Sequence, residues 1–448
     1  MAGSRDGYSQ GTALAEGYLK MTANSKRLLH LLCGLGIAVL ALGPLSRPLA
    51  AQTETVIYSF PGGATGLYSP FAGLVMDTTG ALYGAASSGG QMGDGGVFKL
   101  APPAEKGGSW TETSIYSSAS PAEGEGFFDA GFLVLDKTGS LYGTVRWDGT
   151  RGFGAVFQLT PPASGDTWTE TGLYNFGSGS DAQNPYAGLI AAGGALYGTT
   201  QWGGSSGKGA VFRLTPPAQA GGAWSETVLY SFTGGNDGGE PLASPTAHDG
   251  KLYGTTLNGG AGGNGVVYQL SPPAKGSTVW TETVLHAFPA NFTNDGSSPQ
   301  GALIFDKQGA LYGTTPQTYG AVNYGMVFKL TPPDWEETIL YAFTGGNDGE
   351  YPAGSLILDA KGSLYGTTAG YPYGNQTGAN QGSVFRLTPP AVAGGAWTET
   401  TLHTFTGGSD GGIPTDGLLL KGDALYGTTT SGGPDAQCGC GVVFEITP

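Results

Sequence analysis

The chain has 448 residues, 83 of them glycine, and a formal net charge of −15 at pH 7. Residues 1–51 hold five of the basic and two of the acidic residues, so the remainder carries 14 basic against 32 acidic residues. This charge excludes nucleic acid and anionic membrane surfaces as favoured partners, because both are themselves negatively charged.

The N-terminal 51 residues have the pattern of an export signal. Lys26 and Arg27 precede an almost wholly apolar run over 28–43, and the segment ends in Pro-Leu-Ala-Ala. A basic region, an apolar region and small residues before a cleavage site define a secretory signal peptide. The 16-residue run is shorter than the roughly 20 residues that span a bilayer. We therefore predict Met21 as the true start, cleavage near Gln52 and no membrane attachment afterwards; the alternative is an uncleaved anchor.

A repeat occupies the rest of the chain, 52–448, which we expect to form a single domain. Its centre is the tripeptide Leu-Tyr-Gly, which recurs at intervals of 59, 55, 56, 59, 53 and 61 residues. Its seven leucines are Leu82, Leu141, Leu196, Leu252, Leu311, Leu364 and Leu425. A period of this length predicts stacked or radially arranged units.

Each repeat contains four short runs of strand length, separated by turn-forming residues. In the sixth repeat they lie at 355–359, 363–368, 383–388 and 397–405. Glycine or proline interrupts every window that a helix would need. Four antiparallel strands in each of seven units are typical of an all-β, seven-bladed β-propeller.

The order of the runs predicts how the ring closes. The first run, 53–60 (TETVIYSF), has the pattern of an outermost strand, whereas the last, 442–447 (VVFEIT), has the pattern of a third strand. The final blade therefore lacks its outer strand. We expect 53–60 to join that blade, because this pairing covers an otherwise open sheet edge.

Cysteines and metal-ligating residues give weak signals. Cys33 belongs to the predicted signal, which leaves Cys438 and Cys440 in the last repeat. Their Cys-x-Cys spacing in an oxidising compartment favours a disulfide, with free thiols as the alternative. Two thiols without a nearby histidine are a poor zinc site. We therefore expect no metal and no cofactor.

Residues that differ between the repeats are the candidates for function. In a propeller, the loop after the second strand and the loop after the outer strand leave on the same face, and here both are long and irregular. This irregular face carries the candidate ligand-binding residues Trp147, Asp148, Arg151, Trp202, Asp237, Tyr319, Tyr324, Asp348, Tyr371 and Tyr373. Exposed aromatic rings beside carboxylates suit sugar binding. The alternative is that the aromatics pack on their own loops and the aspartates only form turns.

The repeat consensus DGxxPxxGLxxDxxGxLYGTT…GxGxVFxLTPP…WTETxLYxFTGGNDG resembles the bacterial GloVer (Gloeobacter–Verrucomicrobia repeat, "choice-of-anchor") family. The segments 251–256 (KLYGTT) and 265–273 (GVVYQLSPP) match it closely. The resemblance implies export and a repeat array, often with a C-terminal anchor, but no enzymatic activity or set of functional residues. Because the chain stops at Pro448 directly after its last strand, we expect release to the periplasm or medium.

Two functions from different classes follow. The first is an exported, non-enzymatic binding or scaffold module, monomeric, whose partner is a glycan or another exported protein. The second is a polysaccharide-active hydrolase or lyase that uses paired carboxylates on the irregular face. Two acids with an arginine or histidine at one mouth of the channel would favour the enzyme, whereas dispersed acids with aromatic platforms would favour binding.

Overall fold

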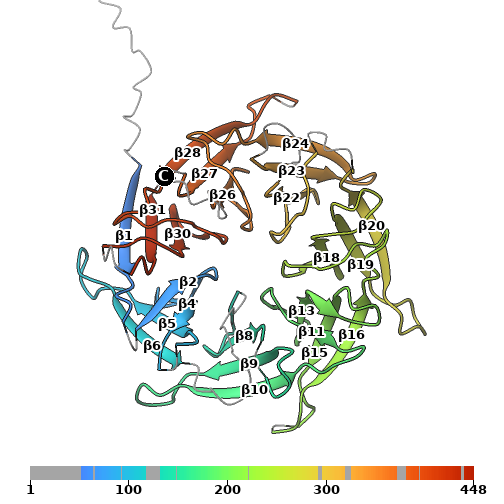
Figure 1. Ribbon diagram of the computed structural model, residues 1–448, viewed down its shortest axis with the longest axis horizontal. Coiled ribbons are helices and arrows are strands. Elements are labelled where there is room, and N and C mark those ends of the chain that lie inside the picture. Colours follow the sequence, from blue (N-terminus) through green and yellow to red (C-terminus); the bar gives the residue numbers. More distant parts are fainter. Residues whose placement is uncertain are drawn as a thin grey trace, which may run out of the picture. The chain divides into compact units, whose positions relative to one another are not determined.

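Each repeat folds into a four-stranded antiparallel sheet, and seven such sheets form a ring in chain order (Figure 1). The computed structural model describes residues 52–447 apart from 64–65, 92, 118–131, 148, 220, 291–294, 318–323, 371–379, 393 and 435–437. These residues belong to one compact unit, Ala50–Pro448. Every regular element among them is a strand. The predicted seven-bladed β-propeller is confirmed.

The two inner strands of each blade form a hairpin beside the central channel. The innermost strands are β3 (Val75–Met76), β7 (Val134–Leu135), β12 (Ile190–Ala192), β17 (Thr246–His248), β21 (Ile304–Phe305), β25 (Ile357–Leu358) and β29 (Leu419–Lys421). The second strands contain the Leu-Tyr-Gly tripeptide and are β4 (Leu82–Gly89), β8 (Leu141–Val145), β13 (Ala195–Thr200), β18 (Lys251–Thr256), β22 (Leu311–Thr315), β26 (Leu364–Thr368) and β30 (Ala424–Thr429).

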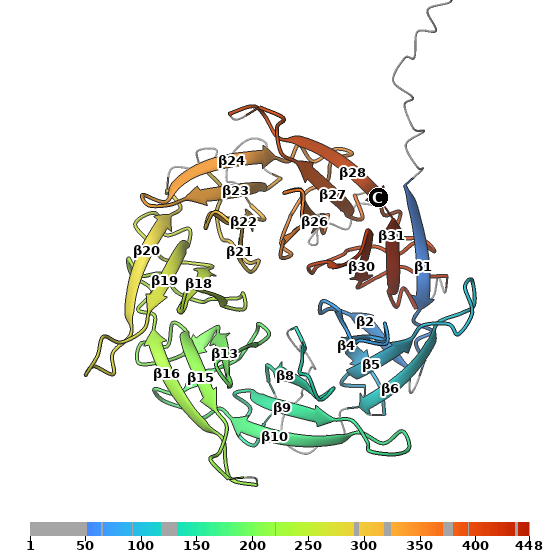
Figure 2. The same ribbon diagram turned by 180° about the vertical axis from the view of Figure 1, so that it is seen from behind.

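The two outer strands of each blade complete the sheet toward the rim (Figure 2). The third strands are β5 (Gly96–Ala101), β9 (Ala155–Thr160), β15 (Ala210–Thr215), β19 (Val266–Ser271), β23 (Met326–Thr331), β27 (Ser383–Thr388) and β31 (Val442–Thr447). The outermost strands are β6 (Thr111–Ser117), β10 (Thr169–Asn175), β16 (Ser225–Ser231), β20 (Thr281–Ala287), β24 (Glu336–Ala342), β28 (Thr398–Thr404) and β1 (Thr53–Ser59).

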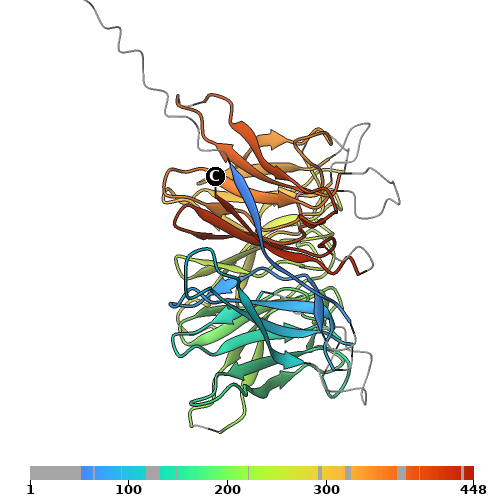
Figure 3. The same cartoon turned by 90° about the vertical axis from the view of Figure 1, so that its left-hand side faces the viewer.

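The first strand of the chain closes the ring, as predicted. β1 pairs antiparallel with β31, from Thr53 opposite Thr447 to Ser59 opposite Val442. Figure 3 shows β1 lying along the strands of the last blade. Two further pairings were not predicted. β2 (Leu67–Pro70) pairs with the end of β4, and β11 (Ala182–Gln183) pairs with β14 (Trp202–Gly203), because the long loops of the irregular face fold back on the blades.

Packing between neighbouring blades explains the repeated aromatic and glycine residues. Phe232 of the third blade packs edge-to-face on Tyr268 of the fourth, with ring centroids 5.1 Å apart, and both side chains are fully buried. Within a blade, the third-strand aromatic covers the glycine of Leu-Tyr-Gly. A Cβ on Gly366 would lie 2.6 Å from Phe385, which is too close for a side chain. These repeated positions are therefore structural.

The hairpin turns on the opposite face also follow one pattern. Asp77 accepts hydrogen bonds from the amides of Thr79 (2.8 Å) and Ala81 (3.0 Å), as expected for an aspartate that caps a turn. Its second oxygen accepts a hydrogen bond from the hydroxyl of Tyr83 at 3.0 Å, a contact that the sequence did not predict. The tyrosine of Leu-Tyr-Gly thus ties the second strand to the turn.

At the rim, a glutamate of each of several outermost strands is partly buried next to the preceding blade. We call these places the rim junctions. Burial, and then the charge of an aspartate in the preceding blade's outer loop, raise the pKa of Glu226 and Glu282 to about 7 and that of Glu337 to about 8. Within the described part of the chain, Oε1 of each of these glutamates accepts no hydrogen bond. Their ionised forms are therefore poorly stabilised.

Candidate functional site

The candidate site is a cavity of about 230 Å³ at the centre of the ring. Its wall comes from the short segments that lead into the innermost strands, at the end of the channel nearer the irregular face. When the repeats are aligned, one position of these segments lines the cavity in six of the seven blades, and its residue in the second blade lies outside the described residues. The six residues are Phe71, Tyr186, Leu242, Gln300, Ala353 and Thr415. The next position carries Ala72, Gly131, Ala187, Ala243, Gly301, Gly354 and, in the last blade alone, Asp416.

Asp416 is the one carboxylate among the described residues that line this cavity. Its Oδ2 accepts a hydrogen bond from the amide of Gly73 at 2.6 Å, and its Oδ1 accepts one from Gly417 at 2.7 Å. Burial raises the pKa of Asp416 to about 7, although both amides act in the opposite direction. Asp416 was not predicted as a functional residue from the sequence. Its signal was available, since it is the sole charged residue where six repeats have alanine or glycine.

Beside the cavity, two predicted tryptophans meet around an arginine. The ring centroids of Trp147 and Trp202 are 5.3 Å apart, with an interplanar angle of 64°. Arg146 Cζ lies 4.9 Å from the ring centroid of Trp147, 4.7 Å from that of Tyr186 and 5.9 Å from that of Trp202. We call these four residues the mouth cluster, because Tyr186 also lines the cavity. Such contacts between a cation and aromatic faces are attractive and hold the rings in place.

The mouth cluster is assembled from two blades. Arg146 and Trp147 follow β8 of the second blade, whereas Trp202 lies in β14 and Tyr186 precedes β12 of the third. The β11–β14 pairing sets Trp202 opposite Gln183, and 37% of its surface remains exposed. Arg146 and Tyr186 were not predicted, because they lie in different blades and neither stands out in its own loop. Only the fold brings them to Trp147 and Trp202.

Other predicted candidates lie away from this cluster. Arg151 is exposed, and its guanidinium lies near Gly177 in the loop that follows β10. The ring of Tyr324 packs on Gly345 of its own blade and against the hydrophobic core. Ligand roles for these two residues stay predictions. The remaining predicted residues, Asp148, Tyr319, Tyr371 and Tyr373, lie outside the described residues.

The predicted loop aspartates are bound by their own loops. Asp237 accepts hydrogen bonds from the amide of Thr233 (2.8 Å) and the hydroxyl of Tyr230 (3.0 Å). Asp348 accepts the corresponding bonds from Thr344 (2.8 Å) and Tyr341 (3.0 Å). These loops lie in separate blades, and a ligand role for either carboxylate also stays a prediction.

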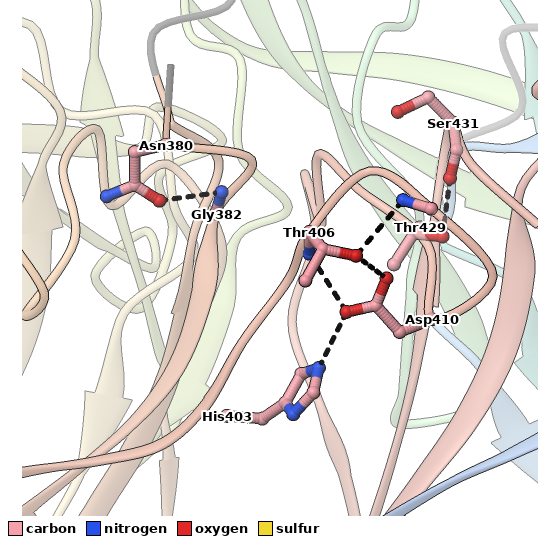
Figure 4. A network of polar contacts seen from close by, with 8 residues as sticks. Asn380, Gly382, His403, Thr406, Asp410, Thr429 and Ser431 are labelled. Atoms are coloured by element: carbon pink, nitrogen blue, oxygen red, sulfur yellow. Dashed lines mark hydrogen bonds and ion pairs between the residues drawn. The ribbon is translucent and has the colours of Figure 1, made fainter. Parts of the chain in front are cut away.

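A third copy of this loop, in the sixth blade, has the same arrangement with histidine in place of tyrosine (Figure 4). Asp410 accepts a hydrogen bond from the amide of Thr406 at 2.8 Å and from its hydroxyl, and its Oδ2 lies 3.3 Å from Nε2 of His403. Because the same contacts recur in at least three blades, they serve the loop that links one blade to the next.

Cys438 and Cys440 lie close together in the last blade, with Cα atoms 5.0 Å apart. This separation is within the range that a disulfide spans. A Cβ on Gly62 would collide with both sulfur atoms, so the pair packs on the segment that follows β1. The disulfide stays a prediction.

The described residues hold no group of three or more histidine, cysteine or acidic side chains placed to bind a metal ion. In the same part of the chain, no helix is long and apolar enough to cross a membrane.

The protein is thus a seven-bladed β-propeller with a cavity in its central channel. The chain belongs to the Gloeobacter/Verrucomicrobia repeat family, whose model matches residues 129–379. The resemblance seen in the sequence is thus confirmed. A search of curated proteins gives no significant match.

Solved structures share the fold at low sequence identity. An ancestral GH74 enzyme has a TM-score of 0.54 and 10% identity, over 89% of this chain and 51% of that one. A chain of the mitotic checkpoint complex has a TM-score of 0.50 and 9% identity, over 90% and 94% of the two chains. The aldose sugar dehydrogenase of Escherichia coli has a TM-score of 0.41 and 13% identity, over 89% and 99%. The first two likenesses concern the fold alone, and the third, with a TM-score below 0.5, supports no conclusion.

Proposed function

We propose that the protein is an exported, non-enzymatic binding module that recognises a glycan at the mouth cluster. The observation that carries this proposal is the convergence of Trp147, Trp202 and Tyr186 on Arg146 from two blades. Aromatic faces stack on the apolar face of a sugar ring, and the guanidinium donates hydrogen bonds to hydroxyl or carboxylate groups at the ring edge.

Carboxylate placement favours binding over hydrolysis. Glycoside hydrolysis ordinarily uses two carboxyl groups about 5–9.5 Å apart, flanking the scissile bond. Among the described residues that line the cavity, Asp416 is the one carboxylate. Asp237 and Asp348 are bound by their own loops in separate blades. The arrangement of an aromatic platform with dispersed acids therefore supports a binding module.

A glycan array probed with the purified protein tests the ligand class, and substitutions test the surface. Trp147→Ala or Trp202→Ala should weaken binding of the best array ligand about tenfold each, since an aromatic stack contributes roughly 1–3 kcal/mol. Both variants should keep the melting temperature of the wild type, because these residues lie at the channel mouth and not in the buried hydrophobic core between blades.

Tyr365→Ala is the matched control, an aromatic truncation at a repeated position between blades. Tyr365 is 7% exposed and packs in the core between the sixth and seventh blades. Its loss should cost about 3 kcal/mol of stability and leave the affinity of the folded protein unchanged. If Trp147→Ala unfolds the protein while Tyr365→Ala does not, the mouth cluster is structural. If no glycan binds to the array, the glycan proposal fails.

Export is part of the proposal, and its support is the n-region, apolar run and cleavage pattern of residues 21–51. Mass spectrometry of the protein recovered from its native host should find an N-terminus near Gln52. Recovery of a chain that retains residues 28–43 would instead indicate an anchored protein.

A further inference from the structure

The central cavity has the chemistry of a site for an organic cation. Its wall includes four aromatic rings, those of Phe71, Phe132, Tyr186 and Tyr351, together with many small residues. None of the described residues that line it is a lysine, an arginine or a histidine. As far as the described residues go, the wall is therefore largely apolar, with a single anionic group, Asp416.

The Asp416 carboxylate is held in a fixed position by the backbones of two blades. The amide of Gly73 in the first blade and the amide of Gly417 in the last each donate to a different oxygen. An ionised carboxylate has about four acceptor positions. These two amides fill two of them, so each oxygen can accept one further hydrogen bond.

The charge of Asp416 is incompletely compensated by the protein. Burial raises its pKa to about 7 against the opposite effect of the two backbone hydrogen bonds, and the described residues that line the cavity include no basic side chain. Arg146 is not one of the lining residues, although its Cζ lies 4.7 Å from the ring centroid of Tyr186. The other ionisable groups of the wall are the hydroxyls of Tyr186 and Tyr351. A bound cation would supply the missing charge.

We infer that this cavity binds a small primary amine, with its ammonium group on the Asp416 carboxylate and its apolar body among the aromatic rings. An ammonium group needs only a few acceptors and is attracted to aromatic faces. A calcium ion takes six to eight oxygen ligands, which one carboxylate does not approach. The volume of about 230 Å³ holds roughly eight water-sized groups at about 30 Å³ each, which sets the size of the amine. The two proposals share Tyr186, which belongs to the mouth cluster and also lines the cavity. They are still separable, because the amine site depends on Asp416 and the glycan site on Trp147 and Trp202.

Calorimetry on the full-length protein tests the amine site with three probes of one shape. These are 2-phenylethylamine, its neutral analogue 2-phenylethanol and the anion phenylacetate. At pH 8 the amine should bind at least tenfold more tightly than the alcohol, and phenylacetate should not bind. Asp416→Asn should remove the preference for the amine. Asp423→Asn is the matched control, because it makes the same change on an exposed residue of the same blade, on the opposite face, and should change the affinity less than twofold.

The pH dependence gives a second measurement on the wild type, which stays informative if Asp416→Asn fails to fold. With a pKa of about 7 for Asp416, the amine must displace a proton below that pH. Its affinity should therefore fall about tenfold from pH 8 to pH 6, with close to one proton released per amine bound at pH 6 in buffers of different ionisation enthalpy.

Four results would overturn the inference. They are equal binding of amine and alcohol, wild-type affinity in Asp416→Asn, an equal loss in Asp423→Asn, and binding at pH 6 without proton release. Competition by micromolar calcium chloride would assign the site to an inorganic cation instead. Trp147→Ala should leave amine binding unchanged, so failure of the glycan proposal and failure of this one are separable.

Discussion

The rim junctions and the channel mouth are built from the same repeat, but they differ in how far their residues are the same from one repeat to the next. At the rim, a partly buried glutamate and a loop aspartate recur from blade to blade, as in Glu226 with Asp181 and Glu282 with Asp237. At the mouth, aligned positions carry different residues, and Asp416 stands where the other repeats have alanine or glycine. Recurrence marks residues that join one blade to the next, whereas departure from the repeat marks candidates for function. A residue's type alone does not separate the two classes.

The largest loss of stability should come from removing a whole strand at the rim while the channel mouth is left intact. Deletion of residues 52–60 takes away β1, the outer strand of the last blade. We expect destabilisation by several kcal/mol, because the blade loses an edge strand and the ring loses its closure. Thermal unfolding followed by circular dichroism measures the change.

A peptide of residues 52–60 added in excess should restore part of that lost stability, because it fills the same edge of β31. An unchanged melting temperature in the deletion variant would show that the pairing of β1 with β31 does not support the ring.

An intermediate effect should come from one rim glutamate. Burial raises the pKa of Glu337 to about 8, so the folded protein binds a proton that the unfolded chain releases at lower pH. Its contribution to stability is therefore greatest at low pH and is lost as pH rises through 8. Glu337→Gln should stabilise the protein at pH 9 by about 1–2 kcal/mol and flatten the dependence on pH.

Chemical denaturation between pH 7 and pH 9 measures this effect. His286 Nε2 lies 3.7 Å from Oε2 of Glu337, but burial lowers the pKa of His286, so this histidine stays neutral over that range. Glu336→Gln is the matched control, since Glu336 is the exposed neighbour on the same strand, and it should change little. Equal effects of the two substitutions would assign the result to net charge.

The smallest effect on stability is expected for a core residue that differs from its counterparts in the other repeats. Tyr268 stands where the other repeats have phenylalanine, and its hydroxyl is buried without a hydrogen-bond partner in the described part of the chain. Tyr268→Phe should leave stability unchanged or raise it by up to about 1 kcal/mol.

The opposite sign is expected for Tyr253→Phe, because the Tyr253 hydroxyl donates to Gln269 at 3.1 Å. Urea unfolding of both variants measures the difference. If Tyr268→Phe instead destabilises the protein, the hydroxyl has a function. Tyr268 would then be a candidate functional residue, like Asp416, because it too differs from the residue found in the other repeats.

Much of the fold was predictable because its signals are local and repeated. Leu-Tyr-Gly, the turn aspartates and the order of strand types predicted seven blades and the role of residues 53–60. The mouth cluster was half predictable, because Trp147 and Trp202 are exposed aromatics in irregular loops. Arg146 and Tyr186 join them only through the geometry of two blades. The bonds that occupy Asp237 and Asp348 also depend on three-dimensional loop structure, which residue type does not reveal.

Closure by β1 also determines the order in which the chain can finish folding. The strand at 53–59 is synthesised before its partner at 442–447, and the strands of all the blades lie between them in the chain. Until both are present, the outer edge of β31 and the strand β1 remain unpaired, and an open strand edge accepts any matching strand. The entropy cost of joining such distant segments grows only logarithmically with their separation, but pairings between them form slowly. During that interval, β1 of a second copy competes for the same edge, so crowded chains would exchange their first strands.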